Sequence, residues 1–224
     1  MISIDSVVKQ YSPSVRIGSI SLDIPAGGIT ALVGPNVAGK STILTMVGRL
    51  LGIGEGTIEV GGLNVATTKS SELARTLSIL RQENHFISRL TVRQLVGFGR
   101  FPHSKGRLSA QDEAIIDRYI GFLDLEELEG RYLDQLSGGQ RQRAYVAMVL
   151  AQETEYVLLD EPLNNLDIAR SVEMMRMLER AAREFSRTIV IVLHDINFAA
   201  RYASQICALK DGELAFMGTP AEIM

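Results

Sequence analysis

Apolar and polar positions roughly alternate along the first third of the chain, which is the period of a strand with one buried face. The apolar positions are Ile2, Ile4, Val7, Val8, Ile17, Ile20, Leu22 and Ile24. A turn at residues 25–28 and a further strand at 57–60, followed by two glycines, continue the pattern. The N-terminal part is therefore predicted to be rich in β structure.

Several short segments are almost wholly apolar, as expected for central strands of a parallel sheet that is covered on both faces. They are residues 29–33, 156–159 and 188–193. Residues 77–80 and 206–209 are shorter strand candidates. These segments predict an α/β core.

Helical periodicity marks other parts of the chain. Residues 41–51 read as a helix, and apolar residues recur at helical spacing from Thr91 to about Val149, with a loop predicted at 101–106. A helix at 168–185 carries Met174, Met175 and Met177, which we expect in the core. The helical block is interpreted as a lobe inserted into the core, in one domain spanning 1–224: residues 1–84 and 150–224 form the core with its β subdomain, and about 85–149 form the lobe.

The stretch between the strand at 29–33 and the helix at 41–51 fits the phosphate-binding pattern G-x-x-x-x-G-K-[ST]. Backbone N–H groups of such a loop, together with the first turn of the helix, form an anion site. Lys40 can reach terminal phosphates, and the Ser41 hydroxyl can bind Mg²⁺. The alternative is a glycine-rich turn with a chance lysine. The predicted nucleotide-binding residues of this phosphate loop are Gly34, Pro35, Asn36, Val37, Ala38, Gly39, Lys40, Ser41 and Thr42.

Val37 is unusual within the phosphate loop, because β-branched residues are disfavoured at positive φ. Its N–H remains available for an anion. We expect either backbone strain or an altered loop shape at this position.

Polar residues follow the buried strands at their carboxyl ends, where open α/β sheets bind ligands. Asp160 and Glu161 follow 156–159, and His194 follows 188–193. Each could instead be a helix cap or a hydrogen-bonded core group. Facing a phosphate loop, Asp160 can hold Mg²⁺, Glu161 can polarise a water, and His194 can bind the γ-phosphate or that water. Gln82, after the strand at 77–80, could sense the metal. The predicted reaction is nucleoside triphosphate hydrolysis.

Four other features also have simple structural interpretations. Ser137, Gly138, Gly139 and Gln140 open a helix and form a second anion site, although Ser-Gly-Gly alone is only a good turn and cap. Tyr11 could stack on a flat base or be an ordinary half-buried tyrosine. His103 is expected to be a solvated loop residue, and the acidic group at 126–129 a solvated helix end.

The composition limits the expected partners and cellular compartment of the chain. The chain has 224 residues, is 46% hydrophobic and carries a net charge of −3, which gives no reason to expect nucleic acid as the main partner. Its one cysteine, Cys207, excludes an intrachain disulfide and suits a reducing compartment. Apolar runs fall short of the roughly 18 residues of a membrane helix, so we expect a soluble chain without a secretory leader.

These motifs occur in the order found in ABC-type ATPase subunits, and the chain resembles that family along essentially its whole length. The resemblance implies a P-loop NTPase core with an N-terminal antiparallel β subdomain and an inserted helical signature lobe, with ATP and Mg²⁺ as cofactors. It also implies roles for single residues: Tyr11 stacks on adenine, Gln82 senses Mg²⁺ and couples to the transporter, Glu161 is catalytic, Asp167 belongs to the inter-subunit loop, His194 is the switch histidine, and Ser137 with its glycines binds the ATP of a partner chain.

Within that family, residues 161–167 and 99–103 look like those of the iron-siderophore and vitamin B12 importer group. This implies a homodimer joined to two integral-membrane permease subunits at the cytoplasmic face of the membrane, supplied by an extracytoplasmic substrate-binding protein. The alternatives are a soluble ABC ATPase of translation or DNA repair and a nucleotide binder without turnover. The former usually has two cassettes or a long coiled coil, and the presence of Glu161 and His194 argues against the latter.

Overall fold

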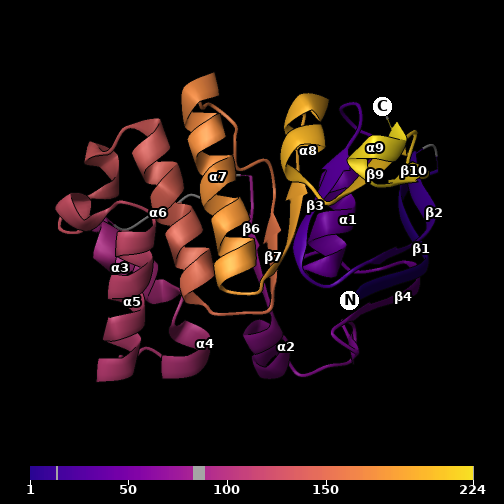
Figure 1. The fold of residues 1–224 in the computed structure, drawn as a ribbon. Coiled ribbons are helices and arrows are strands. Elements are labelled where there is room, and N and C mark those ends of the chain that lie inside the picture. Colours follow the sequence, from indigo (N-terminus) through magenta and orange to yellow (C-terminus); the bar gives the residue numbers. More distant parts are fainter. Residues whose placement is uncertain (14, 83–88, 224) are drawn as a thin grey trace.

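Two β-sheets and a set of helices make up the fold in the computed structural model, which describes residues 1–13, 15–82 and 89–223. Figure 1 shows the small sheet and the C-terminus at one end of the molecule and a group of helices at the other. The phosphate loop lies between a strand of the larger sheet and the first helix.

The smaller sheet is antiparallel and has the strand order β2-β1-β4-β5. Its strands are β1 (Ile2–Ser12), β2 (Val15–Ile24), β4 (Glu55–Val60) and β5 (Leu63–Asn64). The alternating apolar residues of β1 and β2 face one buried side, as the period of two predicts. The predicted N-terminal β subdomain is confirmed.

The larger sheet has the order β10-β9-β3-β8-β7-β6. Its strands are β3 (Gly28–Val33), β6 (Leu77–Leu80), β7 (Tyr156–Leu159), β8 (Thr188–Val192), β9 (Gln205–Lys210) and β10 (Glu213–Gly218). The strands from β9 to β6 pair in parallel, and β10 is antiparallel to β9. Residues after β3, β6, β7 and β8 therefore leave the sheet at the same edge, which is the geometry that brings the candidate site together.

Helices cover the larger sheet and extend beyond it. They are α1 (Lys40–Val47), α2 (Ser70–Thr76), α3 (Val92–Phe98), α4 (Phe101–Ser104), α5 (Ala110–Phe122), α6 (Gly138–Ala151), α7 (Ile168–Glu184), α8 (Ile196–Tyr202) and α9 (Pro220–Ile223), with 3₁₀ turns η1 (Glu126–Leu128) and η2 (Leu133–Gln135). In Figure 1, α3, α4, α5 and α6 gather beside α7, away from the small sheet. We call α3 to α6 the helical lobe.

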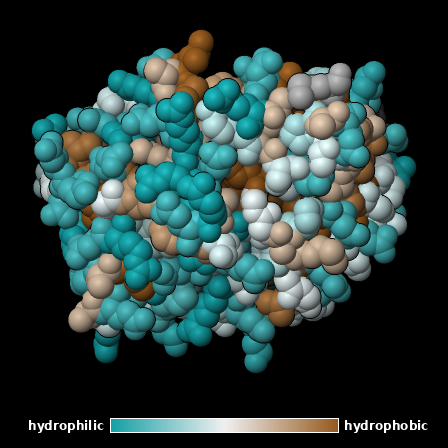
Figure 2. Space-filling model, in the orientation of Figure 1, coloured by the Kyte–Doolittle hydropathy of each residue, from teal (hydrophilic) through white to brown (hydrophobic). Residues whose placement is uncertain are grey.

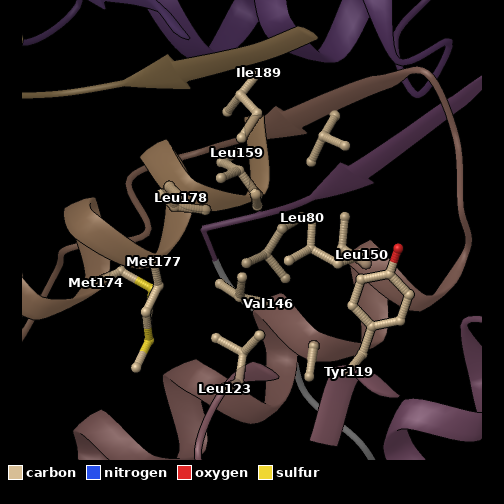
Figure 3. Packing of buried hydrophobic residues seen from close by; sticks show 14 of the residues in the cluster. Leu80, Tyr119, Leu123, Val146, Leu150, Leu159, Met174, Met177, Leu178 and Ile189 are labelled. Carbon is tan, nitrogen blue, oxygen red and sulfur yellow. The ribbon is translucent and has the colours of Figure 1, made fainter. Parts of the chain in front are cut away.

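Two hydrophobic clusters hold these layers. One joins the larger sheet to α7 and the helical lobe, and the other fills the space among α1, the small sheet and the opposite face of the larger sheet. Figure 3 shows side chains of the first cluster converging from strands and helices, among them Met174 and Met177. The methionines are buried core residues, as expected. The face drawn in Figure 2 is largely hydrophilic.

Some local predictions were wrong. The first helix ends at Val47, short of the expected Leu51, because Arg49 adopts a left-handed conformation (φ 57°) just after the cap at Gly48. Residues 101–104 form the short helix α4 instead of a loop. Its proline lies in the first turn, where a missing N–H is tolerated.

Two expected solvated groups have partners. His103 Nε2 lies 2.9 Å from the carbonyl oxygen of Gln152 at the end of α6. Glu129 pairs with Arg93 (Oε2 to Nη1 2.9 Å), which also binds Glu113 and Asp117 on α5. These contacts join the helices of the lobe to one another.

Candidate functional site

The phosphate loop turns sharply between β3 and α1, and glycine is required at its start. Gly34 has φ 144°, and a Cβ there would collide with the carbonyl oxygen of Leu209. Gly39, at the cap of α1, has φ 97°. Val37 has φ 61°, so this β-branched residue lies in the left-handed region, which is the backbone strain expected from the sequence. The residue is 97% exposed.

Lys40 is buried beside this loop, with 5% of its surface exposed. Its Nζ donates to the carbonyl oxygens of Gly34 (2.8 Å) and Pro35 (2.9 Å). Burial lowers the pKa of the ammonium, and the nearby carboxylates of Glu161 and Asp160 oppose that shift. The cation is thus positioned at the loop, with two carboxylates close enough to act on it.

Ser41 and Asp160 meet at the start of α1. Ser41 Oγ donates to Asp160 Oδ1 at 2.7 Å, and Asp160 follows β7 directly. Burial raises the pKa of the Asp160 carboxyl group, and the Ser41 bond opposes this. A hydroxyl and a carboxylate oxygen are ligands that Mg²⁺ accepts, so these residues fit that ion. The described ranges contain no cluster of three or more His, Cys, Asp or Glu side chains of the kind that encloses a metal by itself.

Glu161 is the centre of a hydrogen-bonded group, and its side chain is 9% exposed. Its Oε1 lies 2.8 Å from His194 Nε2, at the end of β8. Its Oε2 accepts hydrogen bonds from Gln82 Nε2 (2.7 Å) and from Asn164 Nδ2. The ends of β6, β7 and β8 thus lie close enough for Gln82 and His194 both to contact Glu161, and the catalytic roles predicted for all three stay predictions.

Several of these side chains line a groove of about 580 Å³. Residues lining it include Tyr11, Val37, Lys40, Glu161 and His194. Tyr11 is 53% exposed, and its hydroxyl lies 3.1 Å from Thr42 Oγ1 on α1. An accessible aromatic face therefore lies at one side of a groove whose other side carries the phosphate loop, which suits a flat base joined to phosphates.

The second anion site lies at the start of α6. Ser137 caps the helix: its Oγ accepts from Gln140 N (3.3 Å), and Gln140 Oε1 accepts from Ser137 N (3.0 Å). We call residues 136–140 the signature turn. Of the described residues that line the groove around Lys40, none belongs to this turn. The turn instead borders a separate cavity of about 120 Å³.

Asp167 follows Glu161 in the same segment and contacts the signature turn through Arg170. It caps α7, with Oδ1 accepting from Arg170 N at 2.9 Å, and its Oδ2 lies 3.3 Å from Arg170 Nε. The Arg170 side chain packs against Gly139, where an added Cβ would lie 2.9 Å from Cδ. Neither Arg170 nor Asn164 had been assigned a role from the sequence. For Asn164, the available signal was an amide three residues after a candidate catalytic carboxylate, within one turn.

Comparisons with known proteins agree with this geometry. The ABC transporter family profile matches residues 17–164. The petrobactin import ATP-binding protein FatE of Bacillus anthracis is 66% identical over 224 residues, covering 100% of this chain and 90% of FatE. The ferric enterobactin transport ATP-binding protein FepC of Escherichia coli K12 is 39% identical over 208 residues, covering 92% of this chain and 77% of FepC. The ATP-binding cassette MJ0796, in a dimeric post-hydrolysis state bound to ADP and Pi, has a TM-score of 0.86 at 28% identity and covers 98% of this chain and 99% of its own.

Proposed function

The chain belongs to the ABC transporter family and is an ATPase with the ABC ATPase fold, and on this premise we propose that it powers the import of a ferric siderophore. The observation that carries the mechanism is the convergence of Lys40, the Ser41–Asp160 pair, Glu161 and His194 at one sheet edge. This convergence matches what hydrolysis of a triphosphate needs: a phosphate cradle, oxygen ligands for a cation and a carboxylate base.

ATP binds along the groove in this proposal. The adenine stacks on Tyr11, and the phosphates bind the N–H groups of the phosphate loop and the ammonium of Lys40. Residues 34–42 form this cradle. Ser41 and Asp160 would hold Mg²⁺, directly or through water, and the ion supplies charge neutralisation at the phosphate oxygens when bound.

Glu161 is the general base for the attacking water. Its carboxylate accepts a proton from the water while the water oxygen forms a bond to the γ-phosphorus, and the bond from that phosphorus to the ADP oxygen breaks. His194 donates a hydrogen bond to the γ-phosphate or to the water. Gln82 binds the carboxylate from the neighbouring strand and senses the metal. Glu161, His194 and Gln82 therefore act together on the reacting atoms.

The working unit is a homodimer. Because the signature turn lies apart from the groove around Lys40, one ATP can contact both anion sites only if a second chain supplies the other. Ser137, Gly138, Gly139 and Gln140 then bind the ATP held by the partner chain, and Asp167 lies in the inter-subunit loop. Loss of the γ-phosphate on hydrolysis removes that shared ligand, and the dimer opens.

The dimer acts through membrane partners. Among the described residues, no helix is both long and apolar enough to cross the bilayer. We place the chain at the cytoplasmic face, attached to two integral-membrane permease subunits that receive cargo from an extracytoplasmic substrate-binding protein. Four relatives are named as petrobactin import ATP-binding proteins, at 66%, 48%, 43% and 38% identity, which makes ferric petrobactin the favoured cargo.

Two experiments test this proposal. Uptake of radiolabelled ferric petrobactin is measured in cells lacking this subunit and any redundant ATPase, with ferric enterobactin as the comparison cargo. We expect uptake of ferric petrobactin to be lost, and undiminished uptake would refute the assignment of ferric petrobactin as the cargo. Separately, Glu161→Gln should retain ATP binding, hydrolyse it very slowly and accumulate as an ATP-bound dimer when measured by light scattering. Wild-type turnover in a protein that stays monomeric with ATP would overturn the assigned roles.

A further inference from the structure

The Glu161 carboxylate is held unequally at its two oxygens. Oε2 accepts hydrogen bonds from both Gln82 and Asn164, whereas Oε1 pairs with His194. Each carboxylate oxygen offers about two acceptor positions. Oε2 is therefore filled by two amide donors, and with respect to the described residues Oε1 keeps a lone pair for a further hydrogen.

The three donors differ in how firmly they are tied to Glu161. Gln82 is exposed and lies beyond the end of β6, and the His194 side chain is 43% exposed at the end of β8. Asn164 belongs to the same turn as Glu161, and its backbone N–H also donates to the Glu161 carbonyl oxygen (3.1 Å). The Asn164 amide thus moves with Glu161, whatever the neighbouring strands do.

Backbone conformation explains why a local donor is useful here. Glu161 has φ 50°, in the left-handed region that non-glycine residues seldom adopt. In this conformation the Glu161 carboxylate meets the amide of Asn164, three residues later in the same turn. Asn164 lines the groove around Lys40 together with Glu161.

We propose that Asn164 is a positioning residue for ATP hydrolysis: its amide occupies Oε2 of Glu161 and leaves Oε1 as the oxygen that accepts the proton of the attacking water. This inference rests on the proposed role of Glu161 as the base. Asn164 acts through Glu161, whose Oε2 its amide binds, and not as a group that takes part in the reaction itself. Its loss should therefore lower kcat and leave nucleotide binding intact.

Two substitutions separate positioning from simple turn formation. Asn164→Ala removes the donor. Asn164→Asp keeps the shape and the turn preference, since Asn and Asp both favour turns, but it sets a carboxylate against the Glu161 carboxylate. A purely structural role predicts that Asp is better tolerated than Ala. Positioning predicts the opposite order, with kcat lowered about tenfold by Ala and about a hundredfold by Asp.

The matched control is Asn165→Asp. Asn165 is exposed, and its φ of 61° is one that Asp tolerates, so this variant adds the same charge one residue further on. All variants are assayed as the full chain joined to its permease in proteoliposomes, with kcat and KM for ATP measured together and ATP affinity measured by calorimetry. We expect a kcat for Asn165→Asp within about threefold of wild type, and unchanged ATP affinity for both Asn164 variants.

Glu161→Gln, alone and combined with Asn164→Asp, makes the failures distinguishable. If Glu161→Gln is slow and the double variant is no slower, the Asn164 effect runs through the carboxylate, as proposed. A second outcome is that Glu161→Gln has a low kcat while the kcat of Asn164→Asp equals that of wild type or exceeds that of Asn164→Ala. In that case the inference about Asn164 is wrong and the proposed function stands. If Glu161→Gln hydrolyses ATP normally, the role of Glu161 fails, and the inference fails with it.

Discussion

Replacing Val37 tests how much the phosphate loop is strained. An L-residue in the left-handed region costs roughly 1–2 kcal/mol, and a β-branched side chain lies at the upper end. The Val37 side chain is 97% exposed, so its removal gives up almost no buried contact. Glycine relieves the strain, but it also makes the unfolded chain more flexible. That flexibility lowers the free energy of unfolding by roughly 0.4–1 kcal/mol, which offsets part of the gain. The expected net gain from Val37→Gly is therefore about 1–1.6 kcal/mol.

Val37→Asn isolates the strain better, because asparagine tolerates the left-handed region and does not add the unfolded-state entropy that glycine adds. It should gain about 1 kcal/mol or more, and Val37→Ala, which keeps a Cβ but not the branch, should gain least. For a chain of this length, 1 kcal/mol corresponds to about 2–4 °C in Tm. Calorimetric melting of the four proteins provides the assay. If neither Gly nor Asn raises Tm above the Ala variant, the strain assigned to φ 61° is absent. The further expectation that Val37→Gly improves ATP affinity or turnover is measured on the same samples.

Two other substitutions probe charge. Lys40→Ala should weaken ATP binding more than about tenfold, because a bond to a charged group contributes roughly 1.5–3 kcal/mol; an unchanged calorimetric dissociation constant would exclude the phosphate site. Hydrogen bonds from the Ser109 backbone and hydroxyl, and then from Arg100, lower the pKa of Asp112 from 3.8 to about 2. Since the folded pKa is depressed, this stabilisation is complete above pH 3.8 and is lost as pH falls towards 2. Asp112→Asn should therefore cost about 2 kcal/mol or more at pH 7 and less at pH 3 in urea titrations, and a pH-independent deficit would contradict the linkage.

The sheet and the lobe could be predicted because their residues repeat a period over many positions. The elements that the sequence did not predict are short or only half buried. The strand β10 is an example, since it lies at the sheet edge with little of its surface fully buried. A signal for it exists: Asp211 (φ 52°) and Gly212 (φ 81°) form the two-residue loop that favours a hairpin between β9 and β10. Helices α2 and α8, of seven residues each, bury one residue apiece and leave no clear apolar face to detect.

The candidate site was predictable as far as strand ends determine it. Parallel strands deliver their following residues to one edge, so Asp160, Glu161 and His194 could be expected to meet. The hydrogen bonds within the site were not predictable, because they depend on backbone angles that composition does not specify. The left-handed Glu161 directs its carboxylate towards Asn164, and that conformation has no signature in the residue type.

The segment from Asp160 to Asp167 links the phosphate loop to the signature turn. Its first residue binds Ser41 at the start of α1, and Glu161 faces Lys40 in the groove. Its last residue caps α7 and pairs with Arg170, whose side chain packs on Gly139 of the signature turn. A hydrogen-bonded turn joins Glu161 to Asn164 in the middle of this segment. If a partner chain binds through the signature turn, as we propose, Arg170 and Asp167 connect that contact to the segment that carries Glu161.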